Sequence, residues 1–405
     1  MAVTIIIDTL LIISLWLLGW LFFLLLRYAT DIKKLLSEPM LKHPVIIFES
    51  DDWGTGPLKQ QNALVQISEL LSRFSDSKGQ HPVMTLGIIL AEPDIDKIKA
   101  TDGQVYHKRT LADTRYIPLL EIIHKGVAQG VFSVHLHGME HFWPASLMHS
   151  VDKNAKVKQW LFANDNLQTE DLPSELQSRW VDSSCLPSSE HSEEDIYRAI
   201  DEELRLYKNI FGQAANIVVP PTFVWTDIVE QAYAAQGIET MITPGRQCIG
   251  RDKQGQPAPN GRYFFNGEEN EGLLFLVRDD YFEPALGHKA ETVLQRISDK
   301  IKCGRPALLE MHRFNFINGA KNNTTSLQEL EKLLQLIVAD LSDARFISAE
   351  QLATIIRNDK RGINSEYMLD SSLQRFKVIL ARVKLLFQFN SFAKYSGINL
   401  LLKLV

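Results

Sequence analysis

Two adjacent carboxylates follow an apolar run that predicts a buried strand. The run PVIIF (44–48) leads into ESDDW (49–53). Two like charges withdrawn from water together repel each other unless a proton or a cation offsets them. A divalent cation bound by one carboxylate would relieve the repulsion and leave the other as a base. Asp51 and Asp52 are therefore candidates for a catalytic base and a metal ligand, although a solvated turn would also suit the pair.

Three histidines lie in or just after a second apolar run, FSVHLHG (132–138). His137 and His141 are four residues apart in HGMEH, so one helical turn would bring both imidazoles to one side, as metal sites often require. His135 precedes them on the same strand face as His137. One carboxylate and two imidazoles with an open position form a common ligand set of hydrolytic zinc. Such an ion polarises a carbonyl and acidifies its bound water.

A further histidine ends the apolar run PALLEMH (306–312). Side chains alternate along a strand, so Leu308, Glu310 and His312 would share one face. A histidine at the end of a strand, across from a metal, could act as a general acid.

These residues need a scaffold that brings several strand ends together. Apolar runs predict seven strands and a weaker eighth, with helix-period segments between most of them. The strands are predicted at 44–50, 83–90, 132–138, 216–223, 239–245, 273–279, 306–312 and 345–348, and helices at 58–74, 114–129, 193–211 and 327–341. This alternation predicts an α/β fold with parallel strands and right-handed crossovers.

We expect a (β/α) barrel of seven or eight parallel strands, because barrels of this class carry their active sites at the carboxyl ends of the strands. An open doubly wound sheet would usually show a glycine-rich phosphate turn after its first strand. SDDWGTG (50–56) stands there instead.

The N-terminal region predicts one transmembrane helix before the barrel. The segment from Thr9 to Tyr28 is nearly all apolar and long enough to cross about 30 Å of hydrocarbon. No positive residue precedes it and no small-residue cleavage site follows it, which favours a retained anchor over a cleaved signal peptide. Arg27, Lys33 and Lys34 lie just after it, so the positive-inside rule predicts a single-pass membrane protein with a cytoplasmic body. An extracytoplasmic body stays open as the alternative.

The C-terminal segment predicts a basic amphipathic helix, with Leu373, Phe376 and Leu380 at helical spacing among basic residues. Such a helix could lie on a membrane surface or dock on the body. The predicted division is an anchor (1–30), a linker (31–43), a barrel (44–358) with an insertion at about 142–190, and the C-terminal segment (359–405).

Composition limits the possible partners. The chain has 405 residues, a formal net charge of −6 and a pI of about 6.0. It lacks the basic excess of a nucleic-acid-binding surface, so we expect no nucleic-acid partner. Its three cysteines are far apart and indicate neither a disulfide framework nor a cysteine metal site.

Taken together, the motifs resemble those of polysaccharide deacetylases, which remove acetyl groups from sugars. SDDWG, HGMEH, VVPPTF and LLEMH occur here in the order of the family's motifs, over about 44–320, and HRFNF (312–316) resembles a divergent deacetylase-like subgroup. The resemblance implies a β/α barrel that binds a divalent metal, with zinc expected. It also implies a carbohydrate substrate, such as an acetylated polysaccharide or a lipid-linked glycan, and attack of a metal-activated water on the acetyl carbonyl.

Carried over position by position, the resemblance implies Asp51 as general base and His312 as general acid. Asp52, His137 and His141 would be the metal ligands.

Further residues would contact the substrate or the reacting carbonyl. The resemblance implies the Thr222 backbone N–H as an oxyanion donor. Glu310 and Arg313 are candidates beside the general acid, and Trp53 would wall the site on the side of the aspartates.

The chain departs from the family at the Pro-rich motif, which usually begins with an arginine that orients the catalytic aspartate. Val218 and Val219 hold the matching positions. Arg246 and Arg313 are the candidates to replace that arginine.

Three other functions fit parts of the pattern. HGMEH also spells H-x-x-E-H, an inverted zinc-protease motif with Glu140 as base, although Gly138 and Pro144 oppose the long helix that it needs. A metal-dependent glycosyltransferase could use adjacent aspartates, without a need for the histidine pair. A catalytically degenerate barrel would bind glycan without turnover, and the missing motif arginine favours it.

Overall fold

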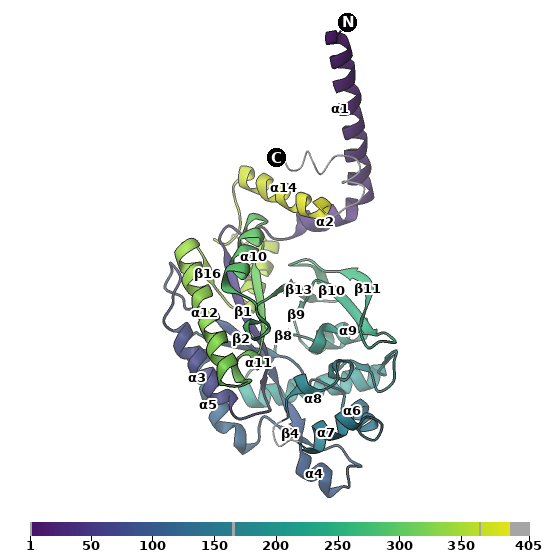
Figure 1. Ribbon diagram of the computed structural model, residues 1–405, viewed down its shortest axis with the longest axis vertical. Coiled ribbons are helices and arrows are strands. Elements are labelled where there is room, and N and C mark those ends of the chain that lie inside the picture. Colours follow the sequence, from purple (N-terminus) through teal and green to yellow (C-terminus); the bar gives the residue numbers. More distant parts are fainter. Residues whose placement is uncertain (1, 164–166, 364–365, 389–405) are drawn as a thin grey trace.

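A computed structural model describes residues 2–163, 167–363 and 366–388 of the chain (Figure 1). All eight predicted strands form, and two short strands join them in one sheet. The strands of this sheet are β1 (Val45–Gly54), β2 (Met84–Ile89), β5 (Phe132–Leu136), β8 (Ile217–Val218), β9 (Thr240–Thr243), β12 (Glu269–Asn270), β13 (Leu273–Val277), β14 (Asp280–Tyr281), β15 (Ala307–His312) and β16 (Arg345–Phe346).

The sheet is curled and open, which corrects the predicted closed barrel. Its order is β12-β13-β9-β8-β5-β2-β1-β15-β14, with β16 beside the start of β1. Every pair is parallel except β12–β13. Only residues 278–279 separate β13 from β14, whereas parallel pairing needs a crossover of a dozen or more residues. These two strands therefore cannot pair with each other, and the fold is a half-barrel whose two sides are joined by a two-residue link.

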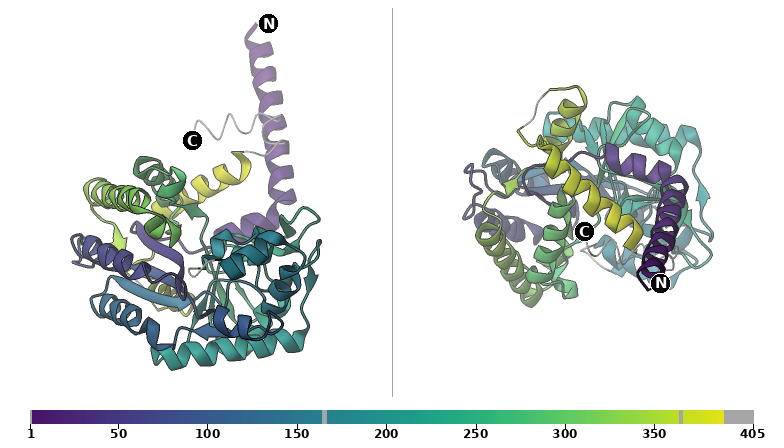
Figure 2. Two further views of the ribbon diagram at one scale, coloured as in Figure 1. Left: turned by 60° about the horizontal axis from the view of Figure 1, so that its bottom comes forward. Right: turned by 90° about the horizontal axis from the view of Figure 1, so that it is seen from above.

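Helices surround the sheet, and four of them occupy the four segments with helical periodicity (Figures 1 and 2). The helices are α1 (Ala2–Arg27), α2 (Ala29–Ser37), α3 (Gln60–Leu71), α4 (Ile95–Ala100), α5 (Ile117–Ala128), α6 (Pro144–Val151), α7 (Ala155–Ala163), α8 (Glu193–Phe211), α9 (Asp227–Ala235), α10 (Ala290–Lys302), α11 (Phe314–Ile317), α12 (Ala320–Asp340), α13 (Ala349–Lys360) and α14 (Ser372–Gln388). Three hairpins complete the fold, β3–β4 (Ala91–Pro93, Lys108–Thr110), β6–β7 (Val181–Asp182, Ser189–Glu190) and β10–β11 (Arg246–Arg251, Pro257–Tyr263).

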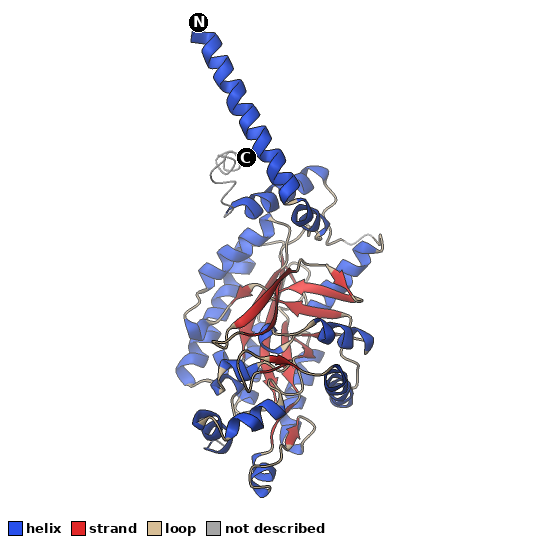
Figure 3. Ribbon diagram, turned by 90° about the vertical axis from the view of Figure 1, so that its right-hand side faces the viewer, coloured by secondary structure: helices blue, strands red, loops and turns tan. Residues whose placement is uncertain are grey.

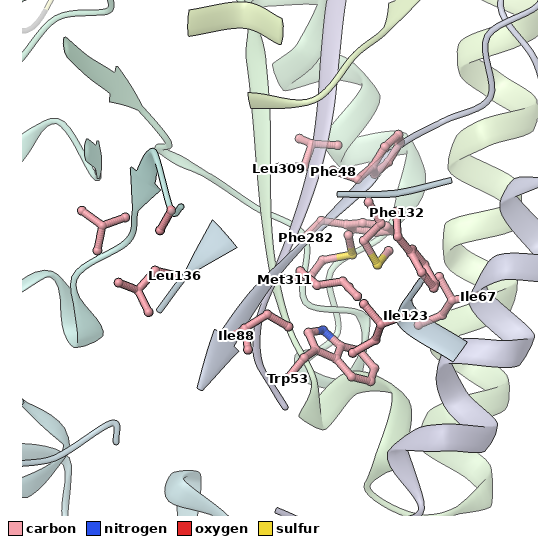
Figure 4. Close-up of a cluster of buried hydrophobic side chains, with 14 of the residues drawn as sticks. Phe48, Trp53, Ile67, Ile88, Ile123, Phe132, Leu136, Phe282, Leu309 and Met311 are labelled. Carbon is pink, nitrogen blue, oxygen red and sulfur yellow. The ribbon is translucent and has the colours of Figure 1, made fainter. Parts of the chain in front are cut away.

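The alternation of side chains along β1 separates two cores. Ile46 and Phe48 belong to the large apolar cluster under the outer helices, part of which Figure 4 shows. Val45 and Ile47 belong to a second cluster with residues of α13, so they face the inside of the curl. This inner face is apolar at the amino end of the strands and becomes charged toward their carboxyl ends, where Glu49 and Asp51 follow in β1.

The first and last described helices, α1 and α14, meet on one side of the body. Residues Ile7–Arg27 of α1 are long and apolar enough to cross a membrane, a property that signal sequences share. At the base of α1, Leu24 is fully buried against Val383 and Leu386 of α14. The C-terminal helix is therefore docked on the body, and residues 389–405 of the predicted C-terminal segment lie outside the described residues.

Candidate metal centre

A bulge in β1 directs both aspartates into the interior of the sheet. Adjacent side chains of a regular strand point to opposite faces, but the pairing of β1 with β2 shifts between Ser50 and Trp53. Asp52 has a φ of 72°, a conformation that is costly for residues with a side chain by about 1–3 kcal/mol. The sequence predicted convergence at a turn after the strand, whereas the structure achieves it within the strand.

Asp52 meets the two histidines of HGMEH. Its Oδ1 lies 3.6 Å from His137 Nε2 and 3.5 Å from His141 Nε2. The histidines lie on the loop after β5 and not on the helical turn that their spacing suggested, and Gly138 gives that loop a φ of 114°. The Nδ1 of His137 bonds to the Val219 carbonyl at 2.9 Å, which leaves Nε2 directed at Asp52.

These three side chains fit a divalent metal. Their candidate ligand atoms all lie within 4.8 Å of one another, and two tetrahedral zinc ligands at about 2.1 Å would be roughly 3.4 Å apart. Asp52 Oδ1 and His137 Nε2 are buried without a hydrogen-bond partner, a costly state for polar atoms that nothing else satisfies. The donor set, one carboxylate and two imidazoles, matches the set expected from the sequence.

The pKa values of the two histidines are shifted in opposite directions. Burial lowers the pKa of His141 to about 4, against the opposing effect of Asp52, so its imidazole is neutral at pH 7 and able to bind a metal. Burial acts in the same direction on His137, but the charges of Asp51 and Asp52 outweigh it and raise its pKa. The two imidazoles therefore respond differently to the same burial, because the aspartates act more strongly on His137.

Asp51 is held by an arginine that sequence reasoning missed. Arg278 Nη2 lies 2.5 Å from Asp51 Oδ2. Burial opposes ionisation of Asp51, but the charges of Arg278 and His137 prevail and hold its pKa well below the usual range. Gly87 leaves room for this carboxylate, because an added Cβ there would lie 2.3 Å from Asp51 Oδ1.

The proposed replacements for the family's arginine lie elsewhere. Arg246 is exposed on β10, and Arg313 donates to the Thr55 carbonyl at 2.8 Å. Arg278 lies next to Asp51 instead, and it contacts two more carboxylates, Glu49 and Glu310, each at 3.2 Å. Burial raises the pKa of both glutamates, against the opposing charge of Arg278.

The second missed residue is Glu283, which bonds to His312. Glu283 Oε1 lies 2.6 Å from His312 Nδ1, and its Oε2 accepts a hydrogen bond from Asn315. Burial lowers the pKa of His312, but the bond and charge of Glu283 prevail and raise it to about 10. His312 is therefore an imidazolium at neutral pH.

The remaining predicted residues occupy distinct places. Trp53 is fully buried in the outer core with its Nε1 donating to Ser50 Oγ at 2.9 Å, which corrects its expected place as a wall of the site (Figure 4). The bulge turns Asp52 inward, so that the next side chain points outward. The Thr222 hydroxyl pairs with Ser178 Oγ at 2.7 Å, and Glu310 lies beneath the site beside Arg278. The substrate roles of Thr222, Glu310 and Arg313 stay predictions.

Glu140, the base of the alternative H-x-x-E-H interpretation, is engaged elsewhere. It is buried, and its Oε2 lies 2.7 Å from Arg179 Nη1. Arg179 also contacts Glu203 at 3.3 Å, and Glu203 accepts the backbone N–H of Met139 at 2.9 Å. The loop 137–141 lacks the protease helix and its glutamate binds an arginine, so the arrangement disfavours that function.

A cleft opens beside Asp52 and His141. The insertion covers one side of it with Phe142 and Trp160, and Arg313 lies on another side. Residues 164–166 of the insertion lie outside the described residues. A ligand in this cleft would touch the candidate metal residues directly.

Comparison with known families gives one match. Residues 112–313, just under half of the chain, match the model of glycosyl hydrolase family 57. The matched region includes His137, His141, Arg278 and His312 but not the aspartates of β1. No curated protein matches the chain.

Several solved structures are similar at low identity. A putative polysaccharide deacetylase from Mycobacterium smegmatis is 10% identical with a TM-score of 0.39, over 81% of this chain and 93% of that one. Peptidoglycan deacetylase from Bacillus subtilis is 10% identical with a TM-score of 0.36, over 79% and 95%. A carbohydrate esterase family 4 pseudoenzyme from Bacillus anthracis is 10% identical with a TM-score of 0.37, over 77% and 66%.

Proposed function

We propose that this protein is a metal-dependent hydrolase that removes acetyl groups from a carbohydrate. The observation that carries the proposal is the cluster of Asp52, His137 and His141 beside two oriented partners, Asp51 with Arg278 and His312 with Glu283. Their separation into a neutral ligand, an ionised carboxylate and a protonated imidazole matches the parts that amide or ester hydrolysis needs.

Asp52, His137 and His141 would hold the ion, which when bound polarises the acetyl carbonyl and acidifies a water. His137 is oriented by the Val219 carbonyl, a second layer of contact of the kind that fixes metal ligands. Asp52 is fixed by the bulge in β1.

Asp51 would accept the proton of the attacking water. Arg278 keeps it ionised and directs its carboxylate, although the same pairing lowers its basicity. Both groups are almost completely inaccessible to bulk solvent, which strengthens their electrostatic interaction.

His312 would protonate the leaving nitrogen or oxygen. Glu283 keeps the imidazole charged and holds its Nδ1, so Nε2 is the atom free to donate. Glu310 approaches that nitrogen at 3.7 Å, a longer distance than a hydrogen bond.

A carbohydrate substrate is supported by the match to glycosyl hydrolase family 57 and by the motif resemblance. That match also favours a second candidate, glycoside hydrolysis. A glycosidase needs two carboxyl groups that flank the bond, whereas Glu49, Asp51 and Glu310 gather around Arg278. The buried metal-type cluster therefore favours acetyl removal.

Two further alternatives lose support. The missing motif arginine favoured a degenerate binding barrel, and Arg278 now supplies a guanidinium at the expected aspartate. A glycosyltransferase would direct both aspartates at one metal, whereas Asp51 is paired with Arg278.

The test uses the purified full-length chain in detergent. Bound metal is measured in wild type, Asp52→Ala, His141→Ala and Asp51→Asn, together with acetate and reducing ends released from acetylated oligosaccharides. We expect metal loss in the first two variants, and retained metal without acetate release in the third. His124→Ala, an exposed histidine, is the matched control.

Wild-type protein without a divalent metal would overturn the hydrolase proposal. Metal retained in His141→Ala would overturn the ligand assignment. Reducing ends without acetate would favour the glycosidase.

A further inference from the structure

The C-terminal helix α14 lies across the body beside the base of α1 (Figures 1 and 2). One side of α14 is fixed to the body by Arg382, which is 1% exposed. Its guanidinium donates to the carbonyls of Cys303, Leu35, Glu38 and Pro39 at 2.7–2.9 Å. Val378 is buried on the same side. The opposite side of the helix therefore points away from the body.

That outer side combines apolar and basic side chains. Leu373 is 66% exposed and Phe376 is 56% exposed, and Lys377 and Lys384 are exposed among them. The helix holds four basic residues and no acidic one. A basic helix with apolar side chains on its free face is the pattern of helices that lie in the headgroup layer of an anionic membrane.

The contact of α14 with α1 indicates that the exposed side of α14 lies near a membrane. Leu24 is 0% exposed because Val383, Leu386 and residues of α2 cover it, so loss of α1 would uncover an apolar surface of the body. Most described side chains of α1 above this point are exposed, and α1 leaves the body as a free helix (Figure 3). The helix α14 therefore contacts the base of a helix that is long and apolar enough to enter a bilayer.

We propose that α14 lies in the headgroup layer of the membrane that α1 enters. This attachment through α1 and α14 orients the body so that the cleft faces away from the membrane. The orientation follows from β1. Its first residue, Val45, is six residues after Pro39, whose carbonyl Arg382 binds, and Asp52 is seven residues further along, roughly 23 Å at about 3.3 Å per residue.

The elements around the cleft lie at the opposite end of the body from α1. The helices α4, α6 and α7 are at that end in Figure 1, and α6 and α7 belong to the insertion that covers the cleft. A substrate would therefore enter from the aqueous side. The orientation therefore favours one substrate class, a glycan chain that reaches the face of the body far from the membrane. It disfavours a sugar attached to a lipid of the same membrane.

The test measures the depth of two positions in the full chain, reconstituted in vesicles of phosphatidylcholine and phosphatidylglycerol. A nitroxide is attached at Phe376→Cys on α14 or at Asp96→Cys on α4, both in a Cys185→Ser background, since Cys185 is the exposed thiol. Leu373→Cys is a second probe of α14. Relaxation by oxygen, which concentrates in bilayers, is compared with relaxation by a water-soluble nickel chelate.

We expect relaxation by oxygen to exceed relaxation by the nickel chelate at both α14 positions. At position 96 we expect the reverse, with relaxation by nickel several-fold larger than at the α14 positions. Equal nickel access at 376, 373 and 96 would overturn membrane contact by α14. Stronger shielding at 96 than at 376 would overturn the orientation. If mass spectrometry of the protein isolated from membranes shows a chain without residues 1–27, α1 is not retained and the proposed attachment is wrong. None of these measurements requires metal or activity, so their failure is distinct from failure of the proposed function.

Discussion

Arg278 and Asp51 form a buried ion pair, with 2.5 Å between Nη2 and Oδ2. The strands that carry them are far apart in the sheet order. Arg278 comes directly after β13, and Asp51 lies in β1, with β9, β8, β5 and β2 between these two strands in the sheet order. The pair spans the interior of the curl and fixes the carboxylate next to the candidate metal ligands. We therefore propose that Arg278 positions Asp51, a role that can be tested separately from metal binding.

Arg278→Met should abolish most activity while the metal is retained. Three carboxylates would lose their buried cation, so we expect a stability loss of about 3–5 kcal/mol and a rate loss on the order of 100-fold. Arg278→Lys keeps the positive charge but not the planar guanidinium, so its losses of stability and rate should be smaller. Acetate release, bound metal and urea unfolding are measured, with exposed Arg246→Lys as control. Full activity in Arg278→Met would refute the positioning role.

Glu283→Gln should move the basic limb of the pH–rate profile to lower pH. His312 donates a proton only while protonated, so activity falls as pH rises through its pKa, raised to about 10 chiefly by Glu283 against burial. Loss of a nearby charge shifts such a pKa by about 1–3 units. The profile of kcat is compared with that of Glu291→Gln, a carboxylate on the surface of α10. An unchanged basic limb would remove His312 as the general acid.

The same pair should make stability depend on pH. Because the folded pKa of His312 lies above its ordinary value of 6.5, protonation of His312 stabilises the fold fully below about pH 6.5. This stabilisation is lost as pH rises toward about 10. Urea unfolding of the metal-free protein should show this loss, and Glu283→Gln should reduce it. Equal slopes in both proteins would contradict the assignment.

Glu140→Gln distinguishes a support of the loop from a catalytic base. The side chain holds Arg179 beneath the loop that carries both histidines, so its loss should weaken metal affinity about 10–100-fold. Excess metal should then restore activity, because Glu140 takes no part in proton transfer. Metal titration and acetate release are followed, with exposed Glu190→Gln as the comparison. Inactivity at saturating metal would revive the H-x-x-E-H mechanism.

Trp53→Phe tests whether this side chain belongs to the core. The variant loses the hydrogen bond to Ser50 and some ring volume, so we expect a stability loss of about 1–3 kcal/mol. KM, kcat and metal content should stay at wild-type values, because the indole faces the outer core. A changed KM in folded protein would place Trp53 at the substrate after all.

Much of the scaffold was predictable, because apolar runs and alternation report burial directly. All eight predicted strands form, and Leu308, Glu310 and His312 do share one face. The closed barrel was wrong because the link between β13 and β14 is too short for parallel pairing, and β14 itself is only two residues long.

The site was predictable in part. The parity of β13 offered a signal for Arg278, since Leu274 and Leu276 face the inner core and the next residue of that parity is the arginine. Glu283 lies in a loop after β14, where no local pattern indicates its contact with His312. The bulge that turns Asp52 inward depends on pairing with β2, which a single strand sequence does not encode.

The link between β13 and β14 has a consequence for the candidate site. The residues that carry the chain from one side of the sheet to the other include the arginine that prepares Asp51. A change in the length or path of this link would therefore also move the guanidinium away from Asp51. One short segment therefore carries both the connection across the open sheet and the charge that holds Asp51.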